Sequence, residues 1–128
     1  MRAILIDPWT RSISEIDVGK GDDERKKALQ CDEFTLGSLD RITSAAGDRL
    51  LLLVDKSYLQ VGYMVDRDNP PVWFVMDADR DPPTTFSVPV LGLLIGLDEN
   101  GFQNDAKISL EELTPRITFM QRPKDYDR

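Results

Sequence analysis

Three short apolar runs constrain the fold of this chain more than any other feature. They cover residues 50–54, 72–76 and 91–95, five residues each. A continuous apolar run of this kind is typical of a β-strand covered on both faces or of a buried helical turn, and its brevity favours a strand. The runs are also far shorter than the roughly 20 residues that span a bilayer. We therefore expect a core built around a sheet and no membrane partner.

The N-terminal part of the chain predicts a hairpin followed by a helix. Residues 2–6 and 12–18 are rich in β-branched side chains, and the Asp, Pro and Thr of residues 7–11 supply turn chemistry between them. Three acidic residues at 22–24 then stand where a helix N-terminus is electropositive. We expect an opening β-hairpin and a short helix over about 22–31.

Further along, strand and turn patterns alternate. Residues 34–39 predict a strand that is interrupted or bulged near Gly37. Ser109 to Glu112 forms a capping-box pattern, in which Ser109 accepts from the third helical amide while Glu112 reaches back. A closing strand at 117–120 follows. Strands on both sides of scattered short helices predict a single α+β domain over residues 1–120, with a mixed or antiparallel sheet, one or two short helices and a polar tail at 121–128.

Charge and composition exclude several classes of function. Sixteen basic against 23 acidic residues give a net charge of −7, which repels a phosphate backbone, so direct nucleic-acid binding is not expected. With Cys31 as the only cysteine and no histidine, intrachain disulfides, Cys/His zinc sites and His-based proton shuttles are excluded. We expect no catalytic residue, no metal and no cofactor. The first residues lack the longer apolar region of a signal peptide, so we expect a cytoplasmic protein.

Two similar loops flank the apolar run at 72–76. Residues 66–71 and 79–83 both combine Asp and Arg with paired prolines, which favour extended backbone. The loops therefore either display Trp73 or Phe74 to a partner or simply reuse the ordinary residues of turns. Trp9 in the first turn is either a binding anchor or a packing residue of the hairpin. The candidate binding residues are Trp9, Asp66, Arg67, Trp73, Phe74, Asp79 and Arg80.

Two further patterns are weaker. Asp77, Asp79 and Asp81 alternate as in a calcium loop, but Pro82 and Val88 stand where an EF-hand needs Gly and Glu, which favours a solvated acidic loop. A pair of carboxylates can do acid–base chemistry, but any such pair arises by chance among 23 acidic residues.

The chain as a whole resembles a domain-of-unknown-function family of small proteins encoded by bacteriophages, plasmids and other bacterial mobile elements. The segments that carry the resemblance are residues 2–8, 10–15, 31–32, 47–48, 50–55, 92–96, 98–101 and 110–119. It implies an accessory protein acting in the bacterial cytoplasm and carries over no catalytic residue. Residues 66–83 depart from the family pattern.

Three functions remain open from the sequence. The leading hypothesis is a non-catalytic phage or mobile-element protein that binds a host protein or a small molecule, with an anti-defence role. The alternatives are a small-molecule-sequestering homo-oligomer with a pocket between subunits and a carboxylate-based hydrolase. Exposed edge strands of a small sheet predict self-association, so a homodimer is a further expectation.

Overall fold

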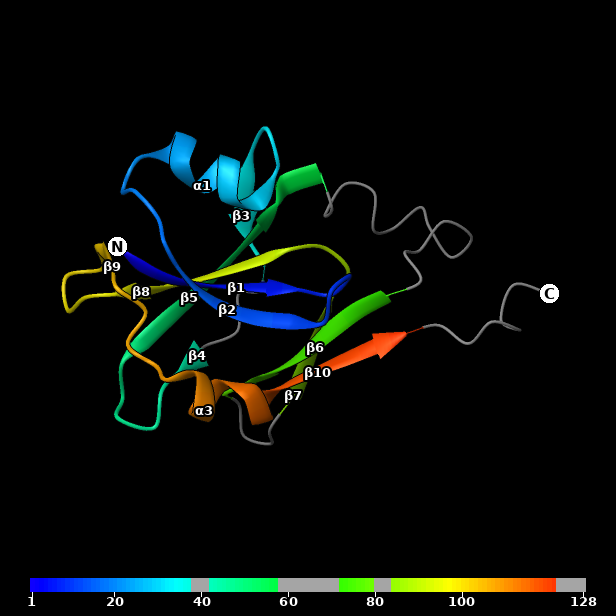
Figure 1. The fold of residues 1–128 in the computed structure, drawn as a ribbon. Helices are drawn as coiled ribbons and strands as arrows, with labels where there is room; N and C mark the ends of the chain where they lie inside the picture. Colours follow the sequence, from blue (N-terminus) through cyan, green and yellow to red (C-terminus); the bar gives the residue numbers. More distant parts are fainter. Residues whose placement is uncertain (38–41, 58–71, 80–83, 122–128) are drawn as a thin grey trace.

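The protein folds into two antiparallel sheets and a few short helices (Figure 1). The computed structural model describes residues 1–37, 42–57, 72–79 and 84–121. The large sheet consists of β1 (Arg2–Asp7), β2 (Ser12–Asp17), β3 (Phe34–Leu36), β4 (Ile42–Thr43), β5 (Arg49–Asp55), β8 (Gly92–Leu97) and β9 (Gln103–Asn104). Its strands lie in the order β2-β1-β8-β5-β3, and in addition β4 pairs with β5 and β9 pairs with β8. The small sheet has the order β10-β6-β7 and consists of β10 (Ile117–Gln121), β6 (Val72–Ala78) and β7 (Thr84–Val88). The helical elements include α1 (Asp22–Leu29), α3 (Leu110–Leu113) and the 3₁₀ turn η2 (Thr114–Arg116), so the expected α+β class is confirmed.

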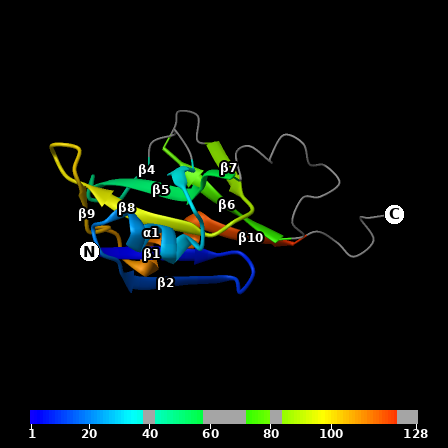
Figure 2. The ribbon, with the colours of Figure 1, turned by 90° about the horizontal axis from the view of Figure 1, so that it is seen from above.

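The large sheet is covered on both faces. Figures 1 and 2 show α1 on one side of it and the small sheet on the other. Because side chains alternate along a strand, Leu52 and Leu94 pack toward the small sheet, whereas Leu53 and Leu93 pack toward α1. This confirms the prediction that the apolar runs in β5 and β8 are strands buried on both faces.

The small sheet is covered on one face only, as far as the described residues show. Phe74 and Met76 of β6 are fully buried against the large sheet, together with Ile117 of β10. The residues between them point the other way, and Asp77 at the end of that outer face is exposed. Along β6, side chains that face the apolar core therefore alternate with side chains on the outer face of the small sheet.

The short helix α3 is capped by only part of the predicted motif. The Ser109 hydroxyl accepts a hydrogen bond from the Glu112 amide at 3.1 Å, as the capping box requires. The carboxylate of Glu112 accepts instead from the amide of Ala45 at 2.9 Å. The reciprocal bond is thus replaced by a tertiary contact that ties α3 to the turn between β4 and β5.

Some predicted boundaries and elements need correction. The first helix ends at Leu29, where Gln30 takes a left-handed conformation, and the strand at 34–36 pairs with β5 without a bulge before Gly37. The strands form two sheets and not one, and the small sheet contains β7, a strand between Pro83 and Pro89 that the sequence pattern does not predict. Gln121, which was assigned to the tail, belongs to β10. Leu39 and residues 122–128 lie outside the described residues.

Candidate functional site

The turn between β1 and β2 exposes a tryptophan on a rigid support. The side chain of Trp9 is 55% exposed. One oxygen of Asp7 accepts from the amides of Trp9 at 2.9 Å and Thr10 at 3.2 Å, and the hydroxyls of Thr10 and Ser12 are hydrogen-bonded at 2.7 Å. These local bonds hold the turn in one conformation, so Trp9 is presented on a fixed backbone.

This turn is also tied to the small sheet. Arg11 adopts a left-handed conformation with φ of 54°, and its guanidinium donates to the side chain of Gln121 at the end of β10. Gln121 pairs with Val72 at the start of β6. Figures 1 and 2 accordingly show the β1–β2 turn at the end of the molecule where β10 ends and β6 begins.

The outer face of the small sheet adds apolar side chains at this same end. Met120 is 39% exposed and lies opposite the half-buried Trp73 in the β10–β6 pair. Their neighbours Phe74 and Phe119 face the core, so Met120 and Trp73 face outward. We call the surface formed by Trp9, Arg11 and Gln121 the Trp9 surface; Met120 and Trp73 lie at the same end of the molecule but on the outer face of the small sheet. The Trp9 surface offers an exposed aromatic side chain near the exposed cation of Arg11, which suits binding.

The structure places two of the residues predicted from the sequence, Trp9 and Trp73, at the same end of the molecule, with Trp9 on the Trp9 surface and Trp73 on the outer face of the small sheet. Of the two aromatic residues that the loops were expected to display, Phe74 is fully buried, so the prediction of Phe74 as a binding residue is wrong, because Trp73 and Phe74 point to opposite faces of β6. Asp79 lies beyond the far end of β6 and forms an ion pair with Arg116 at 3.1 Å. Asp66, Arg67 and Arg80 lie outside the described residues.

Arg11 and Gln121 of the Trp9 surface, and the neighbouring exposed Met120, are not among the residues predicted from the sequence. Met120 had a signal, because the alternation of Phe119 and Met120 in a strand with one buried face places Met120 outside. Arg11 and Gln121 had none, since they are 110 residues apart in the chain and meet only in the folded protein.

A groove on the surface of the protein lies beside Cys31. Its volume is about 620 Å³, and its lining residues are Lys26, Lys27, Gln30, Cys31, Asp32, Glu33, Asp55, Lys56 and Ser57. Burial raises the pKa of the Cys31 thiol, and the carboxylates of Asp55 and Asp32 raise it further. The thiol is therefore protonated at neutral pH and is a poor nucleophile.

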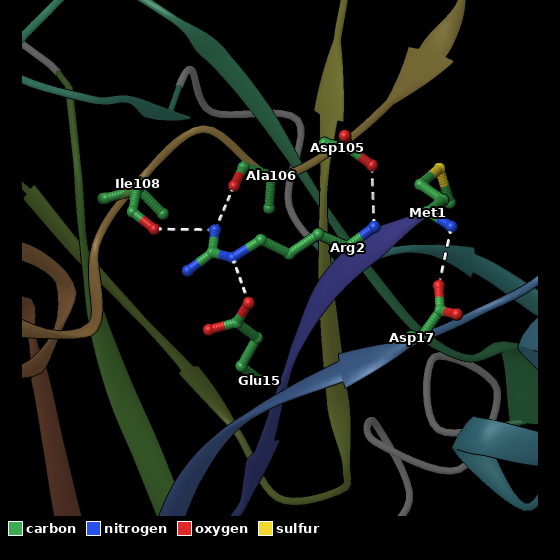
Figure 3. Close-up of polar contacts among 7 residues, drawn as sticks. All are labelled: Met1, Arg2, Glu15, Asp17, Asp105, Ala106 and Ile108. Carbon is green, nitrogen blue, oxygen red and sulfur yellow. Dashed lines mark hydrogen bonds and ion pairs between the residues drawn. The ribbon is translucent and has the colours of Figure 1, made fainter.

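A dense polar cluster surrounds the N-terminus (Figure 3). The guanidinium of Arg2 donates to the carbonyls of Ala106 and Ile108, the latter at 2.9 Å, and pairs with Glu15 at 2.7 Å. The terminal amine donates to Asp17 at 2.8 Å; this hydrogen bond, together with the charge of the amine, lowers the pKa of the Asp17 carboxyl. These bonds fix the segment between β9 and α3 onto β1, so the cluster is structural.

Within residues 1–37, 42–57, 72–79 and 84–121, no group of three or more His, Cys, Asp or Glu side chains is placed to hold a metal ion. No helix in these same ranges has the length and apolar character needed to cross a membrane. Asp81 of the alternating acidic pattern lies outside them.

Comparison with protein-family models, with curated proteins and with solved structures found no match for the chain. The resemblance to phage- and plasmid-encoded proteins therefore stays a prediction.

Proposed function

We propose that this protein is a non-catalytic binding protein that recognises a partner protein through the Trp9 surface. The observation that carries the proposal is the 55% exposure of Trp9 on a turn fixed by the hydrogen bonds of Asp7. A tryptophan brings a large contact area, and residues of this type often supply most of the energy of an interface. Because the turn is ordered before binding, little conformational entropy remains to be lost.

The shape of the surface favours a protein over a small molecule. Small ligands bind in concave sites that enclose most of their area. Trp9 instead stands at the tip of the β1–β2 hairpin, which is a convex part of the molecule (Figure 1). The net charge of −7 favours a partner with a basic face, since opposite charge steers association.

The sequence resemblance supports the finer part of the proposal. Small proteins of phages and plasmids act on the cell that carries them, so the partner we propose is a bacterial host protein in the cytoplasm, and the role is anti-defence. Expression in a bacterial strain with phage-defence systems tests this part. An anti-defence role predicts a higher plating efficiency of phage with the wild-type protein than with Trp9→Ala.

Site-specific photocrosslinking tests the binding surface itself. A benzophenone amino acid is placed at position 9 and, as a matched control, at position 102. Phe102 is also an exposed aromatic residue on a hydrogen-bonded turn, 69% exposed, but the β8–β9 turn that carries it lies at the opposite end of the molecule (Figures 1 and 2). We expect a discrete crosslinked protein from position 9 and not from position 102. The same products from both positions, or none from position 9, would refute the proposal.

A further inference from the structure

We infer that β10 is a self-association edge, through which two copies of the chain pair across a two-fold axis. The two small sheets then join into one six-stranded antiparallel sheet. This goes beyond the proposed function, because it concerns the protein alone and uses the side of β10 that faces away from β6.

β10 has the properties of an unprotected edge. It pairs with β6 on one side, and no strand in the described part of the chain pairs with its other side. Such an edge presents a row of unpaired backbone N–H and C=O groups that can template another strand. Residues 117–121 include no charged side chain, although 30% of the whole chain is charged. The charged side chains that normally protect an edge strand from pairing are therefore absent from β10 itself.

The other edges are protected. β2 carries the carboxylates of Glu15 and Asp17, while β3 and β4 have only three and two residues. β7, the other edge of the small sheet, is flanked directly in the sequence by Pro83 and Pro89, which lack the N–H needed to extend a ladder. β10 is therefore the edge strand that has five consecutive uncharged residues and no proline directly at either end.

The occupant that fits this edge is a second copy of β10. In an antiparallel pair centred on Phe119, the two Phe119 side chains lie opposite each other, and Thr118 lies opposite Met120 of the second copy. Aromatic and mixed pairs of this kind stabilise neighbouring strands, and no like charges meet despite the net charge of each molecule. The antiparallel arrangement also places the two Trp9 turns at opposite ends of the paired strands, which makes the dimer bivalent.

Charge gives the dimer a distinctive response to salt. Two molecules of net charge −7 repel each other, and salt screens this repulsion over distances of about 10 Å at 0.1 M ionic strength. Raising the salt concentration is therefore expected to strengthen the dimer. Binding of a basic partner to the Trp9 surface has the opposite salt dependence, so the two associations are distinguishable.

Analytical ultracentrifugation of the full chain without any partner tests the inference. We expect a monomer–dimer equilibrium for the wild type. Met120→Lys and Thr118→Lys, which add a charge to exposed positions of β10, are each expected to weaken the dimer by roughly tenfold or more. Thr85→Lys is the matched control, because it makes the same change in charge at an exposed position of β7.

Two results would overturn the inference. One is a wild-type protein that stays monomeric at the highest concentration reached. The other is that Met120→Lys and Thr85→Lys weaken the dimer equally, which would show that β10 does not form the interface. Circular dichroism of each variant confirms that it is folded, and neither result bears on crosslinking at position 9.

Discussion

Truncation of two adjacent residues in β6 tests how this strand faces the core. Phe74 is fully buried, and its ring lies so close to Gly92 that a Cβ built on that glycine would come within 2.9 Å of the ring. Phe74→Ala therefore empties a closely packed site, which costs about 3–5 kcal/mol of unfolding free energy. Trp73 is half-buried on the outer face, so Trp73→Ala leaves no enclosed cavity and costs only about 1 kcal/mol.

Urea denaturation measures the difference. With a denaturant dependence of about 2 kcal/mol per molar, Phe74→Ala is expected to lower the midpoint by about 2 M and Trp73→Ala by about 0.5 M. Far-UV circular dichroism is the suitable probe, because Trp73 is one of only two tryptophans and its removal changes the fluorescence. If Trp73→Ala were as destabilising as Phe74→Ala, the assignment of faces in β6 would be wrong, and Trp73 would not face outward.

Two further predictions concern titration. The terminal amine lowers the pKa of Asp17 in the folded protein. The ionised Asp17 carboxylate therefore stabilises the folded state above the unfolded pKa of about 3.9, and this stabilisation is lost as the pH falls through the folded pKa. Thermal melting should therefore show Asp17→Asn to be less stable than wild type at neutral pH, with a gap that closes in strong acid; a constant gap would contradict the pairing. Because the pKa of Cys31 is raised, first by burial and then by Asp55, iodoacetamide should alkylate it more slowly at mildly alkaline pH than the same cysteine in the urea-unfolded chain, and faster in Asp55→Asn than in wild type. A rate equal to that of the unfolded chain would refute this.

Much of the fold follows from local patterns that the sequence displays openly. The opening hairpin, the apolar runs of β5 and β8 and the Ser109 cap all reflect interactions between near neighbours or burial on both faces. The division into two sheets does not follow in this way. It depends on which strands pair. β7 in particular is not predicted, because the prolines directly before and after it are typical of a loop.

The candidate site was only half predictable for a related reason. The place of Trp9 in a turn left both exposure and packing across the hairpin open, and burial of Phe74 follows only once one face of β6 is known. The hydrogen bond between Arg11 and Gln121 joins opposite ends of the chain, so no local sequence pattern predicts it. The Trp9 surface exists because tertiary packing sets the β1–β2 turn beside the end of β10.

The measurement that tests the central claim most directly is the affinity of the crosslinked partner, once purified, for three forms of the protein. These are the wild type, Trp9→Ala and the control Phe102→Ala. If Trp9 anchors the interface, its truncation should cost about 2 kcal/mol or more, a loss of roughly 30-fold in affinity, whereas Phe102→Ala should change it by less than about twofold. Equal affinities for the wild type and Trp9→Ala would contradict the account.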